Sequence, residues 1–220
     1  MKKSLAICLS NLENYVLDMD GTLLDLHFDD TVWNSRLPYH YAKKNNCSLE
    51  RAHGHIKSTL ERSRGSLDWY SFPHWKNKLD IDISSIEMEV LHLVSVKKDT
   101  LRFLTNAKQR QKRLILATNA YPVSLKKKLA ITGIDKYFDH ILSAHEIGHA
   151  KEDTGFWNAR SGKLSLRKTR TLIIDDNLDV LRAASKFGYP ALCAISYPNS
   201  KGNKKNTEEF LGLTSLNELI

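Results

Sequence analysis

The amino-acid sequence predicts an α/β protein with a doubly wound (Rossmann-like), mostly parallel sheet and an inserted α-helical cap. Two observations support this fold class. After about residue 96, short apolar runs typical of buried strands alternate with helical patterns, an order that favours a parallel sheet. Another strand precedes them near the amino terminus, and the interval between is helical, with no convincing strand. We therefore expect an α/β core made of residues 1–25 and 96–220 and a helical cap made of residues 26–95.

The composition is typical of a soluble globular protein. Of the 220 residues, 41% are hydrophobic and 26% are charged, and no apolar run is long enough to cross a bilayer. Cys8, Cys47 and Cys193 are far apart and lack metal-binding spacing, which favours a reducing cytoplasm. Met1–Ser10 resembles a signal peptide over only a few residues, so we expect a loosely held amino-terminal segment instead. We predict a cytoplasmic protein without a membrane partner.

The net charge of +8 favours anionic partners. A basic surface suits a small molecule that carries phosphate, although basic residues often only face solvent and bind no partner. The sequence has no arginine-rich arm, helix-turn-helix signature or aromatic RNA-binding stretch, so we expect no nucleic-acid partner. It leaves open whether the protein is a monomer or a homodimer.

Local signals place the first strand and the cap helices. The β-branched and apolar run Tyr15–Leu17 predicts a buried strand. Ser48 is a candidate N-cap for a helix that extends to about Ser63. Ser84 and Glu87 form a candidate capping box for a later helix. Between them, residues 67–75 are rich in aromatic side chains. We expect most of these rings in the cap interior and one or two facing a ligand.

The core elements follow in order. Asp99 is a candidate cap for a helix through about Lys108. The elements expected after it are a strand Leu114–Thr118, a helix from Pro122 to Gly133, a weaker strand His140–Ser143, a strong strand Thr171–Ile174, a helix from Asn177 to Phe187, a strand Ala191–Ile195 and a loop Tyr197–Asn206.

The first predicted strand ends in two carboxylates, Asp18 and Asp20, followed by Gly21 and Thr22. Aspartate is a poor strand former, so two of them at a strand end carry a local cost. In open α/β sheets, ligands bind beyond the carboxyl ends of the strands. A strand that merely enters a turn would give the same motif, but we favour a functional site.

Other predicted strand ends carry polar groups that could meet these aspartates. They are Thr118 and Asn119, Lys151, and Asp175 with Asp176. Clustered carboxylates raise one another's pKa unless a cation intervenes, and oxygen ligands without nearby cysteines favour Mg²⁺. A lysine and a hydroxyl beside that ion suit a phosphoryl group, which an in-line carboxylate could attack.

These motifs, in this order, resemble those of the haloacid dehalogenase superfamily of phosphohydrolases. The resemblance spans nearly the whole chain and implies Asp18 as nucleophile and Asp20 as general acid and later base. It implies phosphoryl contacts from Thr118, Asn119 and Lys151. The implied metal set is Asp18, the backbone carbonyl of Asp20, and Asp175 or Asp176, with Asp179 supporting the ligands. A second aspartate at position 20 resembles the phosphatase branch rather than the dehalogenases.

A closer resemblance concerns the substrate. Leu23–Asp30, the segment Leu67–Tyr70, the segment Thr118–Pro122 and the segment Gly148–Asp153 are similar to bacterial GMP/IMP-type 5′-nucleotidases. This similarity implies a purine nucleoside 5′-monophosphate as substrate. Within it, Trp69 or Tyr70 could stack on the purine, and Arg64 could meet a carbonyl of the base. Phosphates of sugars or other small metabolites are the alternative substrates.

The sequence leaves open two functions that are not those of a phosphatase. The segment His145-Glu146-Ile147-Gly148-His149 fits the zinc-protease pattern, in which two histidines one helical turn apart bind zinc. Gly148 weakens a helix there, and the residues of the extended motif are missing. A non-catalytic basic binding protein with the same fold is the other alternative, but such a protein would be free to lose at least one of the motif residues.

Overall fold

The computed structural model describes residues 11–161 and 164–219. The predicted loosely held segment at Met1–Ser10, including Cys8, lies outside the described residues. The described helices all fall short of the combined length and apolarity that a bilayer span demands.

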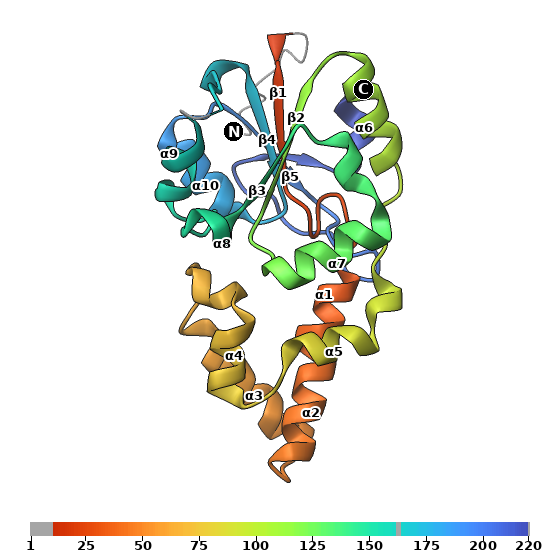
Figure 1. Cartoon of the computed structure of the whole chain (residues 1–220), viewed down its shortest axis with the longest axis vertical. Coiled ribbons are helices and arrows are strands. Elements are labelled where there is room, and N and C mark those ends of the chain that lie inside the picture. The colour runs from red at the N-terminus through yellow and green to blue at the C-terminus, as the bar shows by residue number, and fades with distance from the viewer. Residues whose placement is uncertain (1–10, 162–163, 220) are drawn as a thin grey trace.

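A six-stranded sheet forms the centre of the molecule, in the order β3-β2-β1-β4-β5-β6 (Figure 1). Every pair of neighbouring strands is parallel. The strands are β1 (Asn14–Leu17), β2 (Arg113–Thr118), β3 (His140–Ser143), β4 (Thr171–Asp175), β5 (Ala191–Ile195) and β6 (Leu211–Leu213). The strand order reverses at β1, which is the property of a doubly wound sheet that creates a crevice at the carboxyl ends of the strands.

Helices cover both faces of the sheet and confirm the predicted fold class. Helices α6 (Thr100–Gln109) and α7 (Pro122–Thr132) lie on one side, and α9 (Thr154–Ser161) and α10 (Leu178–Phe187) lie on the other (Figure 1). Side chains of β1 alternate between the two interiors: Tyr15 and Leu17 belong to one hydrophobic cluster and Val16 to the other. Burial of both faces explains why the strands read as continuous apolar runs.

The cap consists of helices that lie beyond one end of the sheet (Figure 1). They are α1 (His27–Thr31), the π-helical turn η2 (Val32–Arg36), α2 (Leu37–Lys44), α3 (Leu49–Glu61), the 3₁₀ turn η3 (Leu67–Tyr70), α4 (Phe72–Leu79), α5 (Ile83–Glu89) and the 3₁₀ turn η4 (Leu91–Leu93). An antiparallel bridge between Leu24 and Val96 joins the two segments that enter and leave this block. The predicted limits of the cap, residues 26 and 95, lie beside that bridge.

The remaining elements of the core are short. They are the 3₁₀ turns η5 (Ile134–Tyr137), η6 (Lys168–Arg170) and η7 (Leu216–Leu219), and the single-turn helix α8 (Ala144–Ile147). Strand β6 was not predicted. Its three residues carry little periodicity, and Leu211 is exposed.

Of the predicted N-caps, Ser48 is confirmed, Ser84 is wrong, and Asp99 lies at the N-cap position of α6 without a side-chain bond to that helix. Ser48 accepts a hydrogen bond from the backbone N–H of Arg51 at 3.2 Å. Helix α5, however, is capped by Asp82 and not by Ser84, because Asp82 lies earlier and its carboxylate accepts the backbone N–H of Ser84. Asp99 makes no side-chain cap; it has a φ of 73°, and its carboxylate accepts a hydrogen bond from the hydroxyl of Ser215.

Candidate active site

Three strand ends converge on one buried ammonium group. Nζ of Lys151 lies 2.5 Å from Oδ1 of Asp18 and 2.7 Å from Oδ2 of Asp175. It also donates to the backbone carbonyl of Ala117 at 3.2 Å. Asp18 follows β1, Ala117 lies in β2, and Asp175 ends β4, so the parallel register brings together residues that are 133 positions apart in the chain. The sequence predicted this convergence.

Lys151 is the buried cation of this site. The side chain is only 3% exposed. Burial works against its charge, but the carboxylates of Asp175 and Asp18 outweigh burial and raise the pKa of the ammonium. Burial also raises the pKa of the Asp18 carboxyl, and Lys151 is the group that opposes this effect. An ionised Asp18 therefore depends on Lys151, because a buried carboxylate without a cation takes up a proton.

The carboxylates of Asp18, Asp175 and Asp176 fit a divalent cation. One oxygen from each lies within 4.8 Å of the others. Oδ2 of Asp18 is buried and has no hydrogen-bond partner among the described residues, so a ligand is the missing partner that its burial calls for. An all-oxygen set of this kind suits Mg²⁺. Nζ of Lys205 lies 3.1 Å from Oδ2 of Asp176 and partly neutralises the cluster.

Gly21 makes room for this carboxylate cluster. Its φ is +89°, a left-handed conformation in which side chains are strained. A Cβ at this position would lie 2.7 Å from Cγ of Asp176. The glycine of the Asp-x-Asp-Gly motif is thus explained both by the turn and by the close approach of Asp176.

Thr118 and Asn119, the predicted phosphate-binding residues, are 1% and 6% exposed at the end of β2. The hydroxyl oxygen of Thr118 accepts the backbone N–H of Ala120 at 3.0 Å. The amide of Asn119 is held at both ends: its oxygen accepts the backbone N–H of Lys151 at 2.9 Å, and its nitrogen donates to Glu152 at 2.8 Å. Both residues lie where the sequence placed them.

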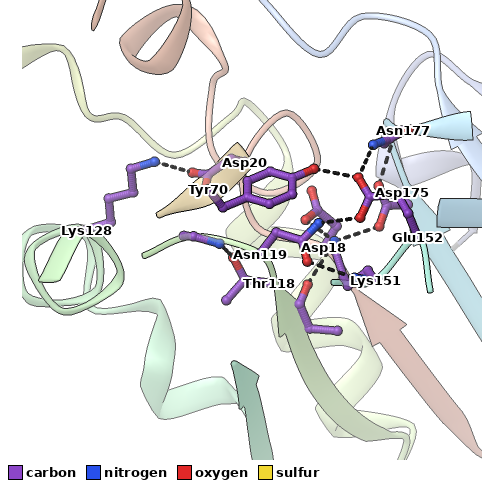
Figure 2. A network of polar contacts seen from close by, with 12 residues as sticks. Asp18, Asp20, Tyr70, Thr118, Asn119, Lys128, Lys151, Glu152, Asp175 and Asn177 are labelled. Atoms are coloured by element: carbon purple, nitrogen blue, oxygen red, sulfur yellow. Dashed lines mark hydrogen bonds and ion pairs between the residues drawn. The ribbon is translucent and has the colours of Figure 1, made fainter. Parts of the chain in front are cut away.

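Asp20 is held by a lysine that the sequence did not single out. Nζ of Lys128, in α7, lies 2.8 Å from Oδ1 of Asp20 and 2.7 Å from Oδ1 of Asp29 in α1 (Figure 2 shows the pair with Asp20). Lys128 is 2% exposed. Burial raises the pKa of Asp29 to about 7, although the neighbouring Lys128 ammonium acts to lower it. No local signal distinguishes Lys128, because it ends a run of three lysines that looks like a solvated helix face.

Glu152 is a second residue that the sequence analysis missed. Its carboxylate accepts hydrogen bonds from the hydroxyl of Tyr70, from Asn119 and from Asn177 (Figure 2). These donors come from the cap turn η3, the end of β2 and the end of β4. The sequence signal was slight: an acidic residue directly after Lys151.

A cavity of about 970 Å³ opens above the carboxylates, between the core and the cap. Its core side includes the predicted catalytic and metal-binding aspartates together with Thr118, Asn119 and Lys151. Its cap side carries aromatic and charged side chains. Among those are His53, Lys57, Glu61, Arg64, Trp69, Tyr70 and Phe72.

The three cap residues predicted to touch the substrate all line this cavity. Trp69 is half-buried, and its backbone carbonyl accepts the indole N–H of Trp75. The hydroxyl of Tyr70 donates to Glu152 at 2.5 Å. Arg64 is largely exposed, and its guanidinium lies 3.7 Å from a carboxylate oxygen of Asp179. Their contacts with a substrate stay a prediction.

Asp179 lies on the rim of the cavity rather than against the carboxylate cluster. Its carboxylate pairs with Arg182 at 2.9 Å and faces Arg64. Its backbone N–H donates to Asn177, whose own N–H donates to Asp175. Support for the metal ligands by the Asp179 side chain therefore stays a prediction that these contacts do not favour.

The zinc-protease interpretation fails on helix geometry. Helix α8 ends at Ile147, and Gly148 has a left-handed φ of 85°. His149 therefore leaves the helix and pairs with Asp153 at 2.8 Å, while the ring of His145 packs edge-on against Tyr121. The two histidines do not share a helical face, so the motif does not form the zinc site that its spacing suggests.

Comparison with known proteins places the chain among hydrolases. A family profile described as haloacid dehalogenase-like hydrolase matches residues 13–188. The GMP/IMP nucleotidase YrfG of Escherichia coli (strain K12) is 34% identical over 214 residues, which cover 97% of this chain and 96% of that protein. The nucleotidase of the same name from Shigella flexneri matches to the same extent.

A solved structure supports the same fold. The phosphatase of the haloacid dehalogenase type from Thermococcus onnurineus superposes with a TM-score of 0.77 and 20% identity, and covers 94% of this chain and 96% of its own. The family match, the near-full-length relatives and the converging strand ends agree. The chain belongs to the haloacid dehalogenase-like hydrolase family, and it is an enzyme of the phosphatase type.

Proposed function

We propose that the protein is a Mg²⁺-dependent phosphomonoesterase that acts through an aspartyl-phosphate at Asp18 and prefers the purine 5′-monophosphates GMP and IMP. The observation that carries the proposal is the environment of the Asp18 carboxylate. One oxygen is fixed by Lys151 at 2.5 Å, and the other is buried in the wall of the cavity with no hydrogen-bond partner in the described part of the chain. A carboxylate held in this way presents one oxygen for attack on a phosphoryl group.

The reaction would proceed in two displacements. In the first, Oδ2 of Asp18 forms a bond to phosphorus while the bond to the leaving oxygen breaks, and the Asp20 carboxyl gives that oxygen its proton. In the second, Asp20 takes a proton from a water molecule that attacks phosphorus, so that phosphate leaves and the Asp18 carboxylate is restored. Lys151 and the polar groups of Thr118 and Asn119 would hold the phosphoryl oxygens.

Magnesium would be held by Asp18, the backbone carbonyl of Asp20, and Asp175 or Asp176. Its contribution would be positive charge beside the phosphoryl oxygens and the attacking carboxylate. The close approach of the carboxylates of Asp18, Asp175 and Asp176 supports this assignment.

The substrate proposal rests on the relatives that act on GMP and IMP and on the form of the cavity. Its volume of about 970 Å³ lies at the upper end of the roughly 300–1,000 Å³ of small-molecule sites. On the cap side, Trp69 offers a flat aromatic surface for a purine, and Arg64 offers a donor to a ring carbonyl. GMP and IMP carry that carbonyl at C6, whereas AMP carries an amino group.

A phosphate-release screen tests the proposal. Wild-type protein and the Asp18→Asn variant would be assayed with GMP, IMP, AMP and sugar phosphates, with and without Mg²⁺. We expect GMP and IMP to be hydrolysed ahead of AMP, only with Mg²⁺, and only by the wild type. Equal or faster turnover of sugar phosphates would overturn the nucleotide preference, and an active Asp18→Asn variant would overturn the mechanism.

A further inference from the structure

The carboxylate of Glu152 accepts three hydrogen bonds from three different parts of the molecule (Figure 2). Oε1 accepts the hydroxyl of Tyr70 at 2.5 Å and the amide of Asn177 at 2.9 Å. Oε2 accepts the amide of Asn119 at 2.8 Å. All three donors are neutral, and a carboxylate is an acceptor only, so each donor is held with its hydrogen toward Glu152.

The contact with Asn119 fixes an amide that faces the site. Its oxygen is already bound to the backbone N–H of Lys151, and its nitrogen is bound to Glu152. An amide held at both ends cannot turn over, so its position relative to Thr118 and Lys151 is defined before substrate arrives.

The contact with Tyr70 crosses from the core to the cap. Tyr70 ends the turn η3, which lies in the cap wall of the cavity, and Glu152 lies in the core directly after Lys151. Burial and the neighbouring Glu152 carboxylate raise the pKa of the Tyr70 hydroxyl well above its usual range, so the phenol keeps the proton that it donates. A short bond to a charged acceptor is among the stronger hydrogen bonds of proteins.

We propose that Glu152 is a positioning residue with two separate tasks in the phosphatase reaction proposed above: it orients Asn119 beside the phosphoryl site, and it latches the cap over the cavity through the hydroxyl of Tyr70. On this proposal, Tyr70 contributes its hydroxyl to cap closure. The inference rests on the proposed function for its kinetic consequences but not for the latch itself.

The two tasks predict different kinetic signatures. Tyr70→Phe removes one hydroxyl and keeps the ring, so only the latch is lost. We expect KM to rise about tenfold, in line with the loss of one hydrogen bond to a charged group, while kcat is unchanged or rises because the cap opens more easily. Glu152→Gln replaces one carboxylate oxygen by an amide NH2 group. This group is itself a donor, so at least one of the three hydrogen bonds is lost, and the remaining neutral oxygen is a weaker acceptor than a carboxylate. We expect this substitution to raise KM and to lower kcat about tenfold or more, because Asn119 loses its orientation.

Two controls separate these effects from general damage. Tyr41→Phe removes a hydroxyl from a half-buried cap tyrosine whose ring stacks on His55, and should leave both constants unchanged. Glu146→Gln makes the same change as Glu152→Gln at an exposed position of α8 and should also be silent. In the double variant Tyr70→Phe with Glu152→Gln, the rise in KM should be smaller than the product of the two single effects, because the hydroxyl acts through the side chain of residue 152. Additive effects would overturn the latch.

Hydrogen exchange measures the latch without any substrate. In Tyr70→Phe and Glu152→Gln, backbone amides of residues 67–79 should exchange faster than in wild type and in Tyr41→Phe, with the sheet unaffected. Unchanged exchange together with unchanged KM in Tyr70→Phe would overturn the proposal. If exchange rises but the wild type releases no phosphate from any monoester, the latch stands and the proposed function fails. The two failures are therefore distinguishable.

Discussion

The ammonium of Lys128 lies 2.8 Å from Asp20 and 2.7 Å from Asp29, and thereby ties the proposed acid–base residue to the first cap helix. Helix α7 supplies this lysine, and the same helix contacts the cap again through Ser124 and Lys127, which both bond to the buried Glu87 of α5. Helix α7 thus joins the core to α1 and α5 of the cap through largely buried charged side chains.

Replacement of Lys128 should destabilise the fold strongly. Lys128→Met would leave two largely buried carboxylates without their cation. Removal of one partner of a fully buried ion pair costs about 3–5 kcal/mol, which is the upper bound for this loss. Urea unfolding measures this loss. The matched control is Lys126→Met in the same helix, where the lysine is exposed and the change should cost less than about 0.5 kcal/mol. Equal losses in the two variants would contradict the buried role of Lys128.

The stability of the protein should depend on pH through Asp29. Burial raises the pKa of this carboxyl to about 7 in the folded protein, whereas the unfolded chain has the ordinary value near 3.8. Between these two values the folded state binds more protons, so the free energy of unfolding falls as pH rises through this window, by at most about 1.4 kcal/mol per pH unit.

Unfolding by urea at pH 5, 6, 7 and 8 checks this expectation. Asp29→Asn removes the titration, so its free energy of unfolding should decline less than that of wild type from pH 5 to pH 7. Asp135→Asn, at an exposed position, should retain the slope of the wild type. A slope in Asp29→Asn identical to that of wild type would show that Asp29 is ionised throughout.

Asp20→Asn should slow both chemical steps. An amide neither gives a proton to the leaving oxygen nor takes one from water, and such proton transfers are typically worth about 10²–10⁴-fold. With p-nitrophenyl phosphate, whose leaving group needs little protonation, the second step should be limiting. A burst of nitrophenolate in stopped-flow measurements, equal to the enzyme concentration, is expected. A loss of kcat below tenfold with natural monoesters would argue against the role of Asp20.

Gly21→Ala should weaken metal binding more than the strain of the turn explains. A Cβ there would meet Cγ of Asp176 at 2.7 Å and would displace that carboxylate. Gly148→Ala is the matched control, because Gly148 has a similar φ of +85° and open space around its missing side chain. We expect a raised Mg²⁺ requirement in titrations of Gly21→Ala alone, and similar requirements in both variants would exclude a steric effect on Asp176.

Local sequence patterns predicted the bounds of those elements that their own residues specify. Strand β3 was predicted with its observed bounds, and β4 differs only by its final residue, because apolar runs between turns specify buried strands. The cap of α5 was wrong because two polar residues, Asp82 and Ser84, lie near its start and the carboxylate of Asp82 takes the backbone N–H. Strand β6 is too short and exposed for its pattern to be recognised.

Asp18, Asp20, Thr118, Lys151 and the Asp175–Asp176 pair could be named from the sequence alone, because parallel strands bring their carboxyl ends to one edge and the motif order specifies which ends matter. Lys128 and Glu152 could not, since the sequence does not show that Asp29 and Tyr70 of the cap reach them. A lysine in a lysine run and a glutamate in a loop have no local periodicity that marks burial. Docking of the cap onto the core adds Asp29 to the partners of Lys128 and Tyr70 to those of Glu152. That docking is a property of the tertiary structure.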